Sequence, residues 1–368
     1  MEERSVPIII ANTSPFRLIQ RDKNDSWNAT LDDINNYSYD YVKLHRLTNF
    51  FDVGLPEPFS MAIGFDGSFI LPALSDFREK EKALGLFNKT IGEIVFGGIY
   101  YEAIQPRDLS FGELYFIGYF KRHHQNGGIN ANFHNAIGMK KASPLDSIKL
   151  LDPKVVYFSE LMKAMVEGRR ILKPFPNLSV PLALNGITYF INNQWAESLS
   201  NIWTSIEQIV SQFWEDEIII KDESMKDITG RKKFLEDYRT WVTSARIELL
   251  FQKSLIDKAT YKSLNVARKA RNEFIHNGTL PVKNQANSAI EALFSLISLA
   301  NSKFSDSTLL TDILNNIKSF DSFEKQSTKQ VLTNDKIVCW MPIPLIPGDT
   351  NWGDKPYEII EDIQLKPI

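Results

Sequence analysis

The stretch WAESLSNIWTSIEQIVSQFW, residues Trp195–Trp214, places large apolar side chains on one side of a helix. These residues fall at positions i, i+3, i+4, i+7, i+10, i+11 and i+14, and they are Leu199, Ile202, Trp203, Ile206, Ile209, Val210 and Phe213. An α-helix has 3.6 residues per turn, so this spacing produces one continuous apolar stripe. The stretch therefore predicts a long amphipathic helix that packs against other helices.

Similar patterns downstream predict further helices at residues 231–252, 257–276, 284–304 and 307–320. The connections between them are short, which favours an antiparallel helical bundle. Just upstream, LKPFPNLSVP (residues 172–181) contains three prolines and marks a linker or a turn into a new unit. We therefore expect the bundle to occupy residues 179–325.

The residues before this boundary have a different pattern. β-Branched and aromatic runs, separated by Gly, Asn, Asp and Pro, predict strands at residues 6–13, 59–71, 93–104 and 114–120. Helical spacing appears among them at residues 75–94 and 155–172. The predicted fold class is α+β, with a strand-rich mixed domain over residues 1–178, sensory or regulatory in role, ahead of the all-α bundle. Residues 326–368 are rich in proline and are expected to form an extended tail.

The composition narrows the class of protein. The chain has 368 residues, enough for two domains and a large core, and its formal net charge is -3. That balance argues against a protein coated with basic charge for nucleic acid. The charge is uneven, however, because residues 230–271 hold eleven Lys or Arg against four Asp or Glu. This run is either a solvated helix face or an anion-binding face.

Cysteine usage and hydropathy indicate the compartment. Cys339 is the only cysteine, which excludes a disulfide framework within one chain and favours a reducing compartment. No stretch approaches the roughly 20 apolar residues that a membrane span needs, and the first apolar run is too short for a signal peptide. We therefore expect a cytoplasmic protein without a membrane partner.

The most informative polar motif is ARKARNEFIHNG, residues 267–278. Gly278 follows the last periodic residue and Pro281 lies just beyond, and both are helix stop signals. His276 is therefore expected in the last helical turn, five residues after Arg271. Five residues correspond to a rotation of about 140°, so the two side chains diverge unless the helix end is distorted or another chain completes the site. A routine helix end and a catalytic pair both remain open here.

Arginine and histidine together suit the cleavage of RNA by its own 2′-hydroxyl group. Arginine grips phosphate with a planar, permanently charged fork, and histidine transfers protons near neutral pH. The reaction needs these two functions and no metal. The five histidines are accompanied by no His-Glu-x-x-His motif and no cysteine pair, so neither a metal site nor a cofactor is expected.

The run RNEFIH (residues 271–276) fits the pattern R-(N/D/H)-x3-H on the third helix of the predicted bundle. In these features the chain resembles the HEPN superfamily, and most closely the Apea-like domains of anti-phage abortive-infection proteins. The resemblance covers residues 186–323 and implies a metal-independent endoribonuclease, acting in phage defence or as a toxin. It implies that Arg271 holds the scissile phosphate of an RNA substrate and that His276 is a general acid or base. It also implies that Asn272 orients groups of the site or forms a hydrogen bond within it.

The same resemblance implies a site shared between two chains. HEPN sites are usually composite, so a homodimer through the helical domain is expected, and a phage-derived trigger or partner protein fits the setting. Glu207 resembles a polar position that some members direct at the site, although a solvated helix glutamate explains it equally well.

Other candidates are weaker. Arg268, Lys269 and Lys262 either follow an RNA backbone or form a solvated face. KRHHQNGG (residues 121–128) is either an anion-binding segment or a polar hairpin loop, and the loop is the favoured interpretation. Two other functions remain open: a non-catalytic HEPN module that binds nucleotide or RNA or scaffolds a partner protein, and a ligand-binding protein whose strand-rich half carries the site.

Overall fold

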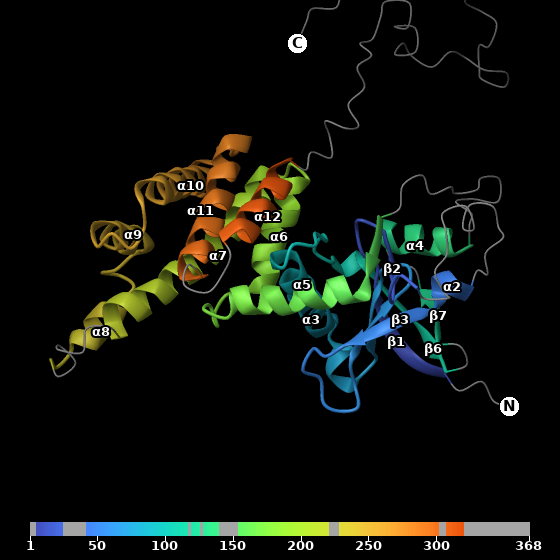
Figure 1. Ribbon diagram of the computed structural model, residues 1–368. Coiled ribbons are helices and arrows are strands. Elements are labelled where there is room, and N and C mark those ends of the chain that lie inside the picture. Colours follow the sequence, from blue (N-terminus) through green and yellow to red (C-terminus); the bar gives the residue numbers. More distant parts are fainter. Residues whose placement is uncertain are drawn as a thin grey trace, which may run out of the picture. The chain divides into compact units, whose positions relative to one another are not determined.

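An antiparallel sheet forms the first part of the computed structural model, which describes residues 5–24, 42–116, 119–125, 128–139, 154–220, 228–301 and 307–319 (Figure 1). Among these residues, six strands follow one another across the sheet in the order β3, β4, β5, β1, β6 and β7. Their bounds are β1 Ser5–Ala11, β3 Leu47–Phe51, β4 Met61–Gly64, β5 Phe69–Pro72, β6 Leu109–Tyr115 and β7 Phe120–Gln125.

The sheet curls until its two outer strands meet. At the start of β3, the backbone N–H of Leu47 donates to the carbonyl of Tyr119 at 2.8 Å. The preceding residue, Arg46, forms an isolated antiparallel bridge with Phe120 at the start of β7. One face of the sheet is therefore enclosed by the curl, and the other face packs against helices.

Successive side chains of β1 point to opposite faces of the sheet, and both faces are apolar. Ile8 and Ile10 contact the apolar residues inside the curl, whereas Ile9 and Ala11 belong to the main hydrophobic core. This period of two is the expected property of a strand buried on both sides. Residues 8–11 (IIIA) are therefore all apolar, because both faces of the strand are buried.

Short elements flank the sheet. Strand β2 (Arg17–Gln20) runs parallel to β8 (Lys154–Tyr157) in a separate two-stranded pairing. Helix α2 (Val42–His45) precedes β3, and helix α4 (Ile129–Met139) follows β7. The 3-10 turns η1 (Ser75–Arg78) and η2 (Pro106–Asp108) complete this part.

Helices α3 (Lys80–Phe96) and α5 (Phe158–Leu172) pack against each other with touching backbones. A Cβ atom on Gly97 would collide with the carbonyl group of Ala164, and one on Gly168 would collide with the carbonyl group of Glu93. Glycine is required at both crossings because no side chain fits between the chains. These two helices cover the outer face of the sheet and contact the bundle.

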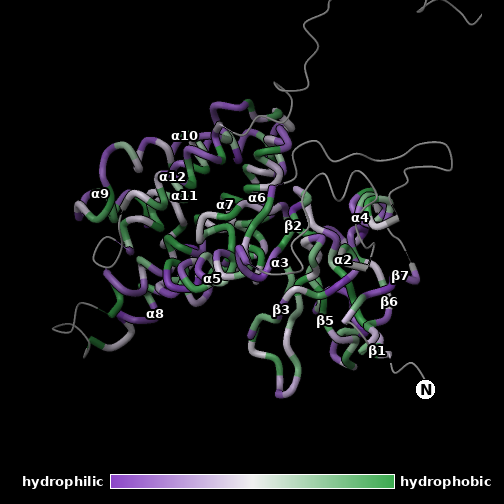
Figure 2. The backbone as a smooth tube through the Cα atoms, turned by 45° about the vertical axis from the view of Figure 1, so that its right-hand side comes forward, coloured by the Kyte–Doolittle hydropathy of each residue, from purple (hydrophilic) through white to green (hydrophobic). Residues whose placement is uncertain are grey.

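The helical bundle follows in sequence. Helices α6, α7, α10 and α11 pack side by side, and Figure 2 shows hydrophobic stretches gathered where α6, α7 and α11 meet. The bounds are α6 Val180–Ile191, α7 Trp195–Trp214, α8 Arg231–Glu236, α9 Thr243–Gln252, α10 Lys258–Asn277, α11 Lys283–Asn301 and α12 Ser307–Ser319, with a π-helical segment at Glu215–Ile220 after α7. The stripe predicted on α7 is confirmed, since all its members are buried except Phe213, which is half-buried.

The fold is α+β, as predicted, and one hydrophobic core runs through it. A single cluster of buried side chains extends from β1 through α3 and α5 to α12. At the predicted boundary of residues 178 and 179 the packing continues, because a Cβ atom on Gly92 of α3 would meet Val180 of α6. Residues 5–319, where described, form one compact unit, so the division into domains at that boundary remains a prediction. The predicted tail, residues 326–368 with Cys339, lies outside the described residues.

Several local predictions were wrong. The strand expected over residues 114–120 is the end of β6, a turn at Phe116 and Tyr119 and the start of β7, and the strand expected over residues 59–71 is the antiparallel pair β4 and β5. The helix expected over residues 231–252 is broken into α8 and α9, because the Asp237 side chain accepts hydrogen bonds from the Arg239 backbone and the Thr240 hydroxyl and so competes with helical bonding. The strand expected over residues 93–104 is the end of α3 and a loop. The loop expected over residues 121–128 is largely strand β7, and its Lys121 is buried.

Candidate active site

Helix α10 presents the predicted motif, and the local sequence determines both of its ends. At the N-terminus the Asp257 side chain accepts a hydrogen bond from the Thr260 backbone at 2.8 Å, which is an N-cap. At the C-terminus Gly278 has φ +69°, and its backbone N–H donates to the Phe274 carbonyl at 3.0 Å. The predicted helix end at Asn277 and Gly278 is therefore confirmed.

Buried apolar residues fix the rotation of α10 about its axis. Leu264, Ala267 and Ala270 are buried, and the helix packs there against α11 and α7. Arg271 and Asn272 follow directly and are half-buried at the edge of this contact. Arg271 donates from Nη1 to Oδ1 of Asn272 at 3.3 Å. The amide thus holds the guanidinium by one nitrogen and leaves the others for a ligand.

His276 lies in the last turn of α10 and is exposed, as predicted. The helix continues to Asn277, so five residues separate Arg271 and His276 by a rotation of about 140°. No hydrogen bond joins their side chains in the described part of the chain. One protomer therefore presents the two groups in diverging directions, on the flank and on the outer face of the same helix.

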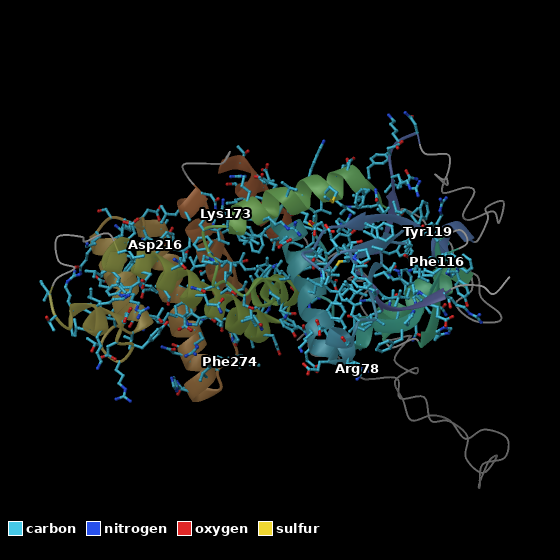
Figure 3. The ribbon with its side chains drawn as sticks, turned by 90° about the horizontal axis from the view of Figure 1, so that it is seen from below. Arg78, Phe116, Tyr119, Lys173, Asp216 and Phe274 are labelled. Atoms are coloured by element: carbon cyan, nitrogen blue, oxygen red, sulfur yellow. The ribbon has the colours of Figure 1, made fainter. Side chains whose placement is uncertain are left out.

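The end of α10 also exposes apolar side chains. Ile275, Leu280 and Val282 are 51 %, 73 % and 58 % exposed, and we call these three residues the α10-end patch. In Figure 3, the labelled Phe274 marks this end of the helix, which projects from the neighbouring helices. Exposed apolar residues that gather beside a polar motif are typical of a contact surface.

The predicted basic residues divide into two groups. Lys262, Lys269 and His276 are exposed and follow at intervals of seven residues, or about two turns, so they share the outer face of α10. Arg268 is half-buried instead, and it donates from Nη2 to the side chain of Asn265 at 3.4 Å. Lys262 and Lys269 therefore lie beside His276, whereas Arg268 lies on the same flank as Arg271.

Glu207 is held in another part of the bundle. Its Oε1 atom accepts hydrogen bonds from Nε1 of Trp203 at 2.8 Å and from the hydroxyl of Thr243 at 3.3 Å. No hydrogen bond or ion pair connects it to Arg271, Asn272 or His276 among the described residues. Glu207 thus joins α7 to α9, and it also lines a cleft that is described below.

Sequence reasoning missed a buried polar network in the strand-rich part. Asp66 accepts from the Lys121 ammonium at 2.6 Å, contacts Nδ1 of His134 at 3.0 Å and accepts from the Ser68 hydroxyl at 2.7 Å. The other ring nitrogen of His134 lies 2.9 Å from the carbonyl oxygen of Thr13. The four side chains of this network are buried.

The network is electrostatically coupled. Burial alone would raise the pKa of Asp66, but the Lys121 charge and the hydrogen bond from His134 outweigh it and lower that pKa well below its usual value. Burial also lowers the pKa of the neighbouring His123 to about 3, so this imidazole is neutral at physiological pH. The lysine, the aspartate and His134 are buried and His123 is half-buried, and the described surroundings give them the role of a polar core.

Two absences among the described residues bear on metal binding and on membranes. Within the described ranges, no three His, Cys, Asp or Glu side chains are placed to share a metal ion. Across the same residues, every helix is too short or too polar to cross a membrane.

No protein-family model matches this chain, and no curated protein or solved structure matches it either. The resemblance to HEPN domains therefore rests on the motif and on the helix that carries it.

Proposed function

We propose that the chain is a metal-independent endoribonuclease of HEPN type. The observation that carries the proposal is the placement of the motif: a half-buried Arg271, tied to Asn272, precedes an exposed His276 in the last turn of a bundle helix. Arg271 would bind the scissile phosphate, His276 would transfer protons, and Asn272 would orient the guanidinium. Lys262 and Lys269, on the same face as His276, would bind neighbouring phosphates of the RNA.

The chemistry requires two proton transfers. One histidine removes the proton from the 2′-hydroxyl group as its oxygen attacks phosphorus, and the bond from phosphorus to the 5′-oxygen breaks. A second histidine gives a proton to the departing 5′-oxygen. The guanidinium balances the charge that develops on the phosphoryl oxygens. The products are a 2′,3′-cyclic phosphate and a 5′-hydroxyl end.

The divergence of Arg271 and His276 supports a site built from two chains. Two copies of α10 related by a two-fold axis would supply two arginines and two histidines, which matches the two proton transfers. The α10-end patch offers apolar contact area for this pairing. Because the basic run of residues 230–271 would repel its copy, RNA between the two chains would favour the arrangement.

The decisive experiment measures cleavage of a labelled single-stranded RNA by the wild type, Arg271→Ala and His276→Ala. Both variants should lose cleavage while they keep the thermal stability of the wild type. Asn315→Ala, at an exposed amide on α12 of the same bundle, is the control and should cleave normally. If His276→Ala cleaves RNA at the wild-type rate, the proposal is wrong.

A non-catalytic RNA-binding module is the second candidate, and the exposed row of Lys262, Lys269 and His276 favours it. Such a module would bind RNA with a salt dependence set by these cations and would release no product. The setting of the proposed ribonuclease, a phage-defence protein or toxin in the cytoplasm with a phage-derived trigger, rests on the family resemblance alone. Overexpression in bacteria with and without His276→Ala tests it, because a toxin should arrest growth only with the histidine present.

A further inference from the structure

A cleft of about 650 Å³ opens at the far end of α7 and differs from the motif on α10. It is lined by residues of α7, by the π-helical segment that follows, and by residues around α8 and α9. Asp216, labelled in Figure 3, marks the π-helical segment. The volume lies in the usual range for a small-molecule site, about 300–1,000 Å³.

Arg246 lines this cleft and is only 4 % exposed. Its Nε donates to the carbonyl of Trp241 at 2.8 Å, and its Nη1 donates to the hydroxyl of Ser211 at 3.3 Å. The guanidinium lies 4.2 Å from the ring centroid of Tyr238 and 5.4 Å from that of Trp214. These contacts fix the plane of the guanidinium and leave Nη2 without a hydrogen bond among the described residues.

No carboxylate neutralises Arg246 in the described part of the chain. Glu207, Glu215 and Glu236 line the same cleft, yet none of them forms an ion pair with it. A buried cation without an anion is costly, and the two aromatic rings offset only part of that cost. Among the described residues this cation thus has no anionic partner, and an anionic ligand that binds from solvent would supply one.

The same three carboxylates restrict what that ligand is. A polyphosphate or a stretch of nucleic acid would bring several negative charges next to them, which is unfavourable. A single carboxylate fits one available guanidinium nitrogen, and an amino group fits the acidic lining. Glu207 has one oxygen engaged with Trp203 and Thr243, and Glu215 has no hydrogen-bond partner among the described residues, so both keep acceptor capacity.

We infer that the Arg246 cleft binds a small zwitterion of the amino-acid class, with its carboxylate on Arg246 and its amino group among the glutamates. The exposed Tyr238, whose hydroxyl lies 2.9 Å from the Ser211 hydroxyl, forms part of the entrance. The inference is independent of the proposed ribonuclease, because it uses none of the α10 motif residues. The cleft would give the helical part a site at which an amino compound binds and regulates the protein.

The test is calorimetric titration of the full chain with a series of ω-amino acids of increasing length. Each is compared with the carboxylic acid and the alkylamine of the same length, at constant ionic strength. One length should bind best, and removal of either charge from that probe should weaken binding about tenfold or more, equivalent to ~1.4 kcal/mol. Arg246→Met should abolish this binding.

A second variant guards against misfolding of Arg246→Met. Glu215→Gln changes a half-buried residue at the lining, so the chain should fold, and its preference should shift from the amino acid toward the plain carboxylic acid. Arg239→Ala, at an exposed arginine nearby, is the control and should bind as the wild type does. The inference is overturned if the carboxylic acid or the alkylamine binds as well as the amino acid, if single-stranded RNA displaces the probe, or if no probe binds up to millimolar concentration.

Discussion

Arg271 donates a hydrogen bond to the side chain of its immediate neighbour Asn272 at 3.3 Å, half-buried at the edge of the contact made by α10. A guanidinium held by one amide keeps most of its donors available, and its direction is fixed before any ligand binds. In the proposed ribonuclease, Asn272 is therefore a positioning residue and Arg271 the phosphate-binding one.

Substitution of the motif histidine should separate catalysis from stability. Because His276 is exposed, His276→Ala should change the free energy of unfolding by no more than about 0.5 kcal/mol. The rate of RNA cleavage should fall by about 10²–10⁴-fold, the usual contribution of general acid–base catalysis. Single-turnover kinetics and thermal melts of the same preparations measure both. Lys269→Ala should weaken RNA binding at low salt and leave the cleavage step of bound RNA intact.

Cleavage should survive a chelator. The proposed steps use imidazole for proton transfer and guanidinium for charge, so added EDTA should leave the rate unchanged. The product should carry a 2′,3′-cyclic phosphate or its hydrolysed form, which phosphatase treatment before and after acid distinguishes. Recovery of activity only when Mg²⁺ or Mn²⁺ is restored would contradict the assignment.

Assembly should depend on the α10-end patch. Leu280→Asp places a charge in this exposed apolar surface and should shift the sedimentation of a dimer toward monomer, with loss of cleavage. Val166→Asp is the control, because Val166 is likewise an exposed apolar residue, 58 % exposed against 73 % for Leu280, but lies on α5. A mixture of Arg271→Ala and His276→Ala chains should regain partial activity if the site uses both protomers. A fully active monomer is the outcome that would refute this prediction.

The buried network should contribute stability that depends on pH. Asp66→Asn leaves Lys121 charged and unpaired, so it should lower the free energy of unfolding by about 3–5 kcal/mol near neutral pH. Because the pKa of Asp66 is lower in the folded state, its contribution is fully present above the ordinary aspartate pKa of about 3.9 and is lost as pH falls through the folded pKa. Denaturant unfolding from neutral to acidic pH should therefore show a smaller acid loss in the variant. Equal slopes in both proteins would contradict it.

Hydrophobic periodicity predicted the helices whose apolar side chains keep the same spacing along their whole length. The stripe on α7 and the ends of α10 could be inferred because spacing, capping residues and stop signals agree there. The break after α8 could not be inferred, since Phe234, Tyr238 and Trp241 keep helical spacing while Asp237 bonds locally to Thr240.

Contacts between residues that are distant in the sequence were the other feature that could not be predicted. We predicted Lys121 to be an exposed loop residue, because lysine is almost never buried without a partner. Its partner Asp66 lies 55 residues earlier in the sequence, where no local pattern connects the two. Arg246 likewise counted only as one more charge in a basic run, although two aromatic rings and a serine enclose it. In both cases the decisive neighbour is distant in sequence, so no local pattern contains it.

The packing of α3 and α5 limits how this chain can be recombined with others. Both helices cover the outer face of the sheet and also contact the bundle, while β6 and β7 lie between them in sequence. No single cut in the chain therefore separates sheet from bundle without uncovering an apolar surface. A chimera that exchanges either part with another protein must therefore carry α3 and α5 along as a set, because both helices complete the apolar surface of each part.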